Sequence, residues 1–161
     1  MEQFRKRYYD RFADLRRDLG FLMRERRKIR ALRDGEVIDR AFQERLMLAV
    51  TEVNGCRYCA YAHAKMALSA GLTKSDIEAM AVGDLSGVPQ EQVPALLYAQ
   101  HWAESDAQPD PEVRQTVVDT YGQTQTEAIE LSLRMIRLGN LLGNTGDYLL
   151  YRLSWGRWGG G

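Results

Sequence analysis

Residues 54–63 read Asn-Gly-Cys-Arg-Tyr-Cys-Ala-Tyr-Ala-His, a stretch that holds both cysteines of the chain and one of its two histidines. Asn54-Gly55 predicts the end of one helix, because glycine suits the left-handed conformation of a helix C-cap. The next helix is expected to begin near Cys56. At about 100° per residue, Cys56, Cys59 and His63 share one narrow helix face among small alanines. The spacing therefore predicts a CxxC pair at a helix N-terminus, with an imidazole one turn further on.

Helical spacing of apolar residues continues through the rest of the sequence, and no stretch shows sustained apolar–polar alternation. The expected helices cover about 3–20 with an Arg-rich continuation to 33, 39–54, 56–71, a segment capped by Thr73, 89–105, 111–121, and 126–153. Gly139, Gly143 and Gly146 are expected to break the last of these. The sequence therefore predicts an all-α, single-domain helical bundle.

Length and composition limit the classes of protein that fit. The chain has 161 residues and a mass of 18.4 kDa, with 45% hydrophobic and 27% charged residues, which suits one globular domain. Its longest apolar run, residues 46–50, is far shorter than a membrane span. The charged and aromatic start does not resemble a signal peptide, and two cysteines do not make a disulfide framework. We expect a cytoplasmic protein with no membrane association.

The net charge of zero hides an uneven distribution. Residues 1–33 hold twelve Lys or Arg against five Asp or Glu, so the remaining residues carry an excess of seven negative charges. Apolar residues recur every three or four positions in this basic segment, which predicts an amphipathic helix that packs on an acidic body, within the chain or across subunits. We divide the chain into a basic N-terminal helical segment, 1–35, and a helical domain, 36–161. A scaffold or nucleic-acid module is the alternative, but no binding motif supports it, and we expect no nucleic-acid partner.

The CxxC arrangement favours redox chemistry. The thiolate is the nucleophilic form of cysteine, and a helix N-terminus lowers the pKa of a thiol placed there. On this argument Cys56, nearer the helix start, is the more acidic of the pair. His63 lies one turn beyond Cys59, where a ring nitrogen is able to take the thiol proton. One sulfur can then attack an oxidant and the other can close a disulfide.

These residues carry a resemblance to a known family. Glu44, followed twelve residues later by Cys56-x-x-Cys59-x-x-x-His63 and by the stretch 65–73, resembles the AhpD-like alkylhydroperoxidases of the carboxymuconolactone decarboxylase superfamily. The likeness is specific over 36–84 and looser over 98–148. It implies an all-helical homo-oligomer, a trimer or a hexamer, that reduces hydroperoxides as a thiol-dependent peroxidase. It also implies an external dithiol or electron-donor protein, and no metal or organic cofactor.

The resemblance also assigns roles within the site. Cys59 would attack the peroxide, Cys56 would resolve the product, and Glu44 with His63 would relay the proton of Cys59. This order disagrees with the helix-start argument; we follow the resemblance, because only Cys59 has His63 one turn away. Tyr58 departs from the family pattern, in which well-characterised members have a histidine, and tyrosine is a poor base at neutral pH.

Other readings of the same residues remain open at this point. Cys56, Cys59 and His63 would form a zinc site if His101 supplied a fourth ligand. The cysteines would also serve as small hydrophobic residues in a purely structural module. A lactone decarboxylase is disfavoured, because that branch of the superfamily lacks the CxxC pair. Further along the chain, Asn140 and Asn144 occupy positions where relatives place a polar pair. The C-terminal aromatic residues are interpreted as subunit contacts: Tyr148, Tyr151, Trp155 and Trp158.

Overall fold

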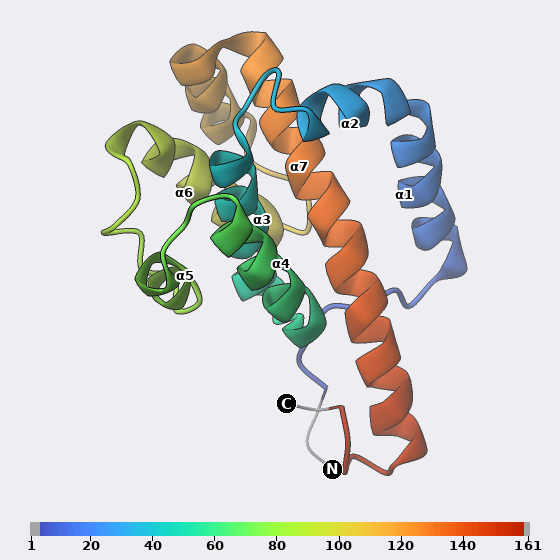
Figure 1. Cartoon of the computed structure of the whole chain (residues 1–161). Helices are drawn as coiled ribbons and strands as arrows, with labels where there is room; N and C mark the ends of the chain where they lie inside the picture. Colours follow the sequence, from blue (N-terminus) through green and yellow to red (C-terminus); the bar gives the residue numbers. More distant parts are fainter. Residues whose placement is uncertain (1–3, 160–161) are drawn as a thin grey trace.

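The structure, a computed structural model, describes residues 4–159 and consists of helices joined by short loops (Figure 1). The helices are α1 (Phe12–Arg24), α2 (Arg26–Arg33), α3 (Arg40–Asn54), α4 (Arg57–Ser69), α5 (Lys74–Met80), the short 3₁₀ helix η1 (Gln90–Gln92), α6 (Val93–Glu104) and α7 (Pro111–Leu153). The described residues contain no strand, and the prediction of an all-α fold is confirmed. None of these helices combines the length and the apolar character needed to cross a bilayer.

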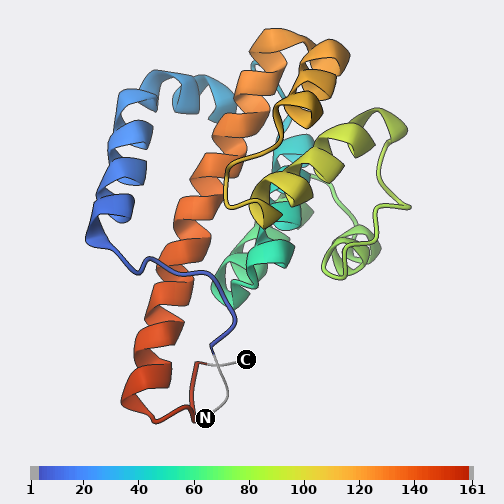
Figure 2. The same ribbon diagram turned by 180° about the vertical axis from the view of Figure 1, so that it is seen from behind.

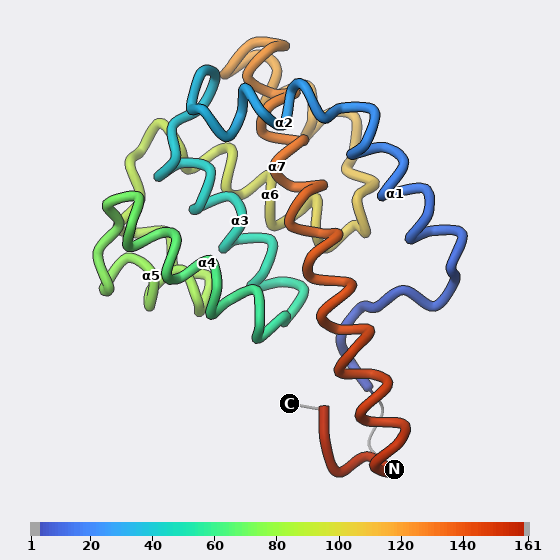
Figure 3. Tube along the Cα trace, turned by 45° about the vertical axis from the view of Figure 1, so that its right-hand side comes forward, coloured from blue at the N-terminus to red at the C-terminus, as the bar shows by residue number. Residues whose placement is uncertain are grey.

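The centre of the fold is α3, with α4, α6 and α7 packed around it (Figure 3). Its sequence is apolar on nearly every side, which is typical of a helix enclosed by others. Leu46 and Val50 of α3 are fully buried, and Leu96 of α6 and Leu133 of α7 meet them in the same core. Burial of each such side chain contributes about 1.5–3 kcal/mol to folding. The core thus fixes the face of α3 that turns toward α4.

Local sequence explains several helix boundaries. Gly55 adopts φ 66° and ends α3, as the Asn54-Gly55 pair predicts. Thr73 caps α5 in a reciprocal capping box with Asp76, in which each side chain accepts a hydrogen bond from the backbone N–H of the other. These caps close the two ends of the segment that carries α4.

The prediction for the last helix is partly wrong. The break near residue 122 is confirmed, because Gly122 has φ 77° and ψ 163° and kinks α7 there. The expected breaks at Gly139, Gly143 and Gly146 do not occur, and the helix continues to Leu153. An isolated glycine costs a helix only about 1 kcal/mol relative to alanine, and tertiary packing along α7 offsets that cost.

The N-terminal segment also differs from its prediction. Gln3 lies outside the described residues, and residues 4–11 form an extended segment rather than the start of a helix. Helix begins only at Phe12 and is interrupted at Glu25, between α1 and α2. The boundary between a basic segment and a helical domain at residue 35 stays a prediction.

Aromatic contacts explain why residues 4–11 are extended. The rings of Tyr8 and Tyr148 stack with their centroids 4.0 Å apart, and Phe4 packs edge-on against Tyr148 at 5.4 Å. Tyr148, interpreted from sequence as a subunit contact, therefore packs within its own chain. Trp155 and Trp158 are 84% and 68% exposed. Phe4 and Tyr8 of this segment thus pack against α7 and do not form one face of an amphipathic helix.

Candidate active site

The CxxC pair lies at the start of α4, as predicted. Cys56 is the N-cap residue, and its Sγ accepts a hydrogen bond from the backbone N–H of Cys59 at 3.4 Å. The thiol thus occupies a position that serine or aspartate commonly fills. The Sγ atoms of Cys56 and Cys59 lie 2.6 Å apart. Cys56 is buried and Cys59 is half-buried, so the two sulfurs differ in their access to solvent.

The two thiols also differ in acidity. A hydrogen bond from the Cys59 thiol lowers the pKa of Cys56 to about 6; burial opposes this shift, and the N–H groups of Cys59 and Tyr58 reinforce it. The same hydrogen bond, together with burial, raises the pKa of Cys59. In the reduced protein at neutral pH, Cys56 is therefore the thiolate and Cys59 its hydrogen-bond donor. This order agrees with the helix-start argument.

The buried Glu44 of α3 pairs with the half-buried His63 of α4. The Nδ1 atom of His63 lies 2.7 Å from Oε2 of Glu44. The Glu44 side chain is 2% exposed, and Arg40 reaches its other oxygen at 3.4 Å. A carboxylate so deeply buried requires partners of this kind, because an isolated charge in an apolar interior is costly. The carboxylate therefore holds the imidazole ring of His63 in a fixed orientation.

A small pocket joins His63 to Cys59. Its volume is about 250 Å³, and its walls come from α3, α4 and α7: Met47, Tyr58, Cys59, Ala62, His63, Met135, Ile136 and Gly139. Most of these side chains are apolar. A molecule that enters the pocket therefore meets the half-buried Cys59 sulfur and the histidine together, with Cys56 buried behind them.

Helix α7 forms one wall of the pocket and leaves space for the two sulfurs. A Cβ atom placed on Gly143 would lie 2.8 Å from Sγ of Cys56, closer than real Cβ contacts, and one on Gly139 would lie 3.8 Å from Sγ of Cys59. Two of the three glycines that the sequence predicts as helix breaks, Gly139 and Gly143, are thus the positions where α7 approaches the thiols. The sequence signal for this role is the spacing of four residues, which places both glycines on one face of the helix.

A buried asparagine on α7 completes the surroundings of the pair. Asn140 is fully buried, donates a hydrogen bond to the Thr51 hydroxyl at 3.1 Å and accepts one from the Asn54 amide at 3.1 Å. Hydrogen bonding by its side chain also acts to lower the pKa of both thiols, but at Cys59 the hydrogen bond with Cys56 and burial outweigh this effect. Asn140 therefore belongs to the site, although sequence reasoning notes it only as part of a polar pair.

The residues of the alternative zinc site do not converge. His101 lies on α6, where its Nε2 accepts a hydrogen bond from the backbone N–H of Asp110 at 3.2 Å. In the described part of the chain, no group of three or more His, Cys, Asp or Glu side chains is placed to hold a metal ion. The geometry thus brings Cys56, Cys59, His63 and Glu44 together without His101.

The thiolate gives a direct test of this arrangement. We expect the ultraviolet absorbance of the Cys56 thiolate to be present at neutral pH and to disappear as the pH falls through about 6. The pKa of this group is lowered in the folded protein, so the charged form is lost on the acid side. Replacing Cys59 with alanine removes the main cause and should move the transition up toward the ordinary thiol pKa. A wild-type transition at that ordinary value would contradict the assignment.

Comparison with known proteins places the chain in a family. A search of curated proteins and a search of solved structures each found no match. A scan against family models matched residues 22–105, a span that contains α3, α4 and the four residues of the candidate site. The wider superfamily of the matched family includes alkylhydroperoxidases. The chain belongs to the carboxymuconolactone decarboxylase family.

Proposed function

We propose that this protein is a thiol-dependent peroxidase that reduces hydroperoxides through the Cys56–Cys59 pair. One observation carries the proposal: Cys59 and His63 line the same pocket, and the Sγ atom of Cys56 lies 2.6 Å from that of Cys59. The apolar lining suits the organic part of an alkyl hydroperoxide. The family supports an enzyme of this kind, because its superfamily includes alkylhydroperoxidases.

The first step is attack by Cys59. Its thiol proton passes to the imidazole of His63, whose positive charge Glu44 stabilises at 2.7 Å. The Cys59 sulfur attacks the terminal peroxide oxygen, the O–O bond breaks, and the departing oxygen takes the proton from His63 to leave as an alcohol or water. Cys59 is then a sulfenic acid, oxidised by two electrons, and the peroxide is reduced by two.

The second step forms the disulfide. The thiolate of Cys56 attacks the Cys59 sulfenic acid, an S–S bond forms as the S–O bond breaks, and the hydroxyl group leaves as water after taking one proton from the solvent. An external dithiol, free or on an electron-donor protein, then reduces the bridge by thiol–disulfide exchange. We assign the attack to Cys59 because it faces the pocket, although Cys56 is the more acidic thiol. We further propose that the protein works in the cytoplasm as a homo-oligomer, a trimer or a hexamer.

A thiol count on the native protein tests the proposal. The reduced protein should show two accessible thiols under denaturing conditions, and none after one equivalent of cumene hydroperoxide, with one alcohol released per disulfide formed. Metal analysis of the same sample supplies the control. Thiols that persist after peroxide, or zinc bound in a one-to-one ratio with both thiols masked, would contradict a peroxidase and favour the structural or metal-binding alternative.

A further inference from the structure

The extended segment 4–11, here called the strap, is anchored beside the site although it lies far from it in sequence. It crosses α7 on the face seen in Figure 2. The amide of Asn144 donates one hydrogen bond to the carbonyl of Arg7 at 2.9 Å and another to the carbonyl of Asn54 at 2.8 Å. The Thr145 hydroxyl accepts a hydrogen bond from the backbone N–H of Tyr9 at 3.1 Å. One buried amide thus joins the strap to the end of α3.

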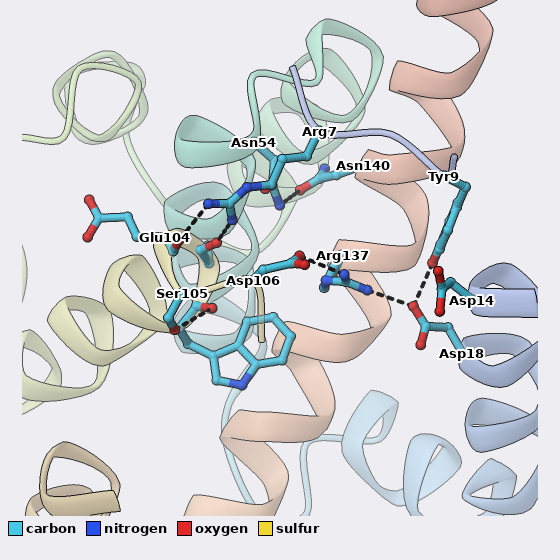
Figure 4. Close-up of polar contacts among 12 residues, drawn as sticks. Arg7, Tyr9, Asp14, Asp18, Asn54, Glu104, Ser105, Asp106, Arg137 and Asn140 are labelled. Carbon is cyan, nitrogen blue, oxygen red and sulfur yellow. Dashed lines mark hydrogen bonds and ion pairs between the residues drawn. The ribbon is translucent and has the colours of Figure 1, made fainter. Parts of the chain in front are cut away.

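Two strap side chains extend this attachment. The ammonium group of Lys6 lies 3.1 Å from Oδ2 of Asp147, and its methylene stem covers Gly55, the turn residue just before Cys56. The guanidinium group of Arg7 donates hydrogen bonds to the carbonyls at the end of α6 (Figure 4). The strap is therefore held at both α6 and α7, and it covers the turn that leads into the CxxC pair.

Asp147 connects the strap to the first turn of α4. Its side chain is fully buried and accepts hydrogen bonds from Arg57 at 2.7 Å and from the Tyr58 hydroxyl at 3.1 Å, in addition to the contact with Lys6. Arg57 and Tyr58 are the two residues between the cysteines. Burial opposes the charge on Asp147, but these donors keep its pKa below the ordinary value. The carboxylate therefore ties three segments together at the point where the two sulfurs are positioned.

The strap and Asp147 lie beyond the region shared with the family. The match covers residues 22–105, which includes neither the strap nor Asp147. The network does not touch the pocket through Lys6 or Asp147 directly; it reaches the pocket wall through Tyr58. Any effect of the strap on the thiols must therefore act by holding the first turn of α4.

We propose that Lys6 and Asp147 are positioning residues, through which the strap holds the Cys56–Cys59 turn in the geometry that its thiol chemistry requires. The inference rests on the proposed function for its use of the two cysteines. It concerns their geometry before any peroxide is present. Breaking the contact between Lys6 and Asp147 releases the start of α4 and weakens the hydrogen bonds that converge on the Cys56 sulfur.

Two substitutions that change the local charge in opposite directions distinguish a positioning role from a purely electrostatic one. Lys6→Met keeps an apolar stem over Gly55 and removes a positive charge, whereas Asp147→Asn removes a negative charge. If the residues act by position, both changes weaken the same hydrogen bonds, and the acidity constant of Cys56 falls at least threefold in each. If they act only as charges, Lys6→Met lowers that constant and Asp147→Asn raises it. Ultraviolet titration of the thiolate measures both.

Two further variants serve as controls. Lys6→Arg keeps the cation and should restore the acidity constant to within twofold of wild type. Arg5→Met removes one positive charge from an exposed neighbour on the same strap and should leave it unchanged. Helical circular dichroism verifies that each variant is folded. Opposite shifts for the two test variants, or no shift in either, would overturn the proposal; because no peroxide enters this experiment, a failure of the peroxidase assignment would appear separately.

Discussion

Replacing Cys59 with serine is expected to reduce peroxide turnover to the uncatalysed rate. A serine hydroxyl at this position is neither acidic enough to ionise nor able to take up an oxygen atom from the peroxide. The pocket, the Glu44–His63 pair and Cys56 all remain, so the loss isolates the attacking atom. Consumption of cumene hydroperoxide with excess dithiothreitol as reductant measures it, and a melting curve equal to that of the wild type confirms the fold.

The matching variant at Cys56 should behave differently. With Cys56→Ser, Cys59 still attacks the peroxide, but no second sulfur is present to displace the hydroxyl group. One equivalent of peroxide should therefore leave a sulfenic acid on Cys59, which dimedone traps and mass spectrometry locates. Full activity in both variants would defeat the mechanism. Sulfenic acid on Cys56 in the Cys59→Ser protein would reverse the two roles and make the more acidic sulfur the attacking one.

Replacing Glu44 with glutamine should produce the second large effect. The substitution keeps the shape of a side chain that is 2% exposed, but removes the negative charge 2.7 Å from the imidazole. His63 then takes up the Cys59 proton less readily, and kcat/KM for the peroxide should fall by about 10²-fold, as is usual when general base catalysis is impaired. The change is measured by initial rates over a range of peroxide concentrations.

Glu52 provides the matched control for this variant. It lies on the same helix, α3, but is exposed to solvent. Glu52→Gln should leave kcat/KM within twofold of wild type. An equally small effect of Glu44→Gln would show that the proton of Cys59 leaves by another route, of which the neighbouring Cys56 thiolate is the nearest.

The sequence is sufficient for features that depend on neighbouring residues. The Asn54-Gly55 cap and the Thr73 cap each depend on a few consecutive residues, and both predictions are confirmed. The position of Cys56 at a helix start follows from the same local signal. The enclosure of α3 is also predictable, because a helix that is apolar on all sides requires neighbours on all sides.

The features that the sequence does not predict depend on contacts between distant parts of the chain. The spacing of Phe4 and Tyr8 is compatible both with one face of a helix and with an extended segment. The extended form is favoured because Tyr8 stacks on Tyr148, which lies 140 positions later in the chain. Gly143 is interpreted from the sequence as a helix break, because the sequence does not show that Cys56 packs against it. Asp147 likewise shows no local sign of its partners Lys6 and Arg57. Pattern analysis does not reach such pairs, because their spacing has no period.

A thiol used as the cap of α4 has an energetic consequence for the proposed redox cycle. Anions are favoured at helix N-termini, so the reduced protein gains a favourable interaction between the Cys56 thiolate and the backbone dipoles that a neutral disulfide lacks. Stabilising the reduced form raises the reduction potential of the couple. If the proposed cycle operates, the disulfide form would therefore accept electrons readily, and a mildly reducing donor would be sufficient to restore the two thiols.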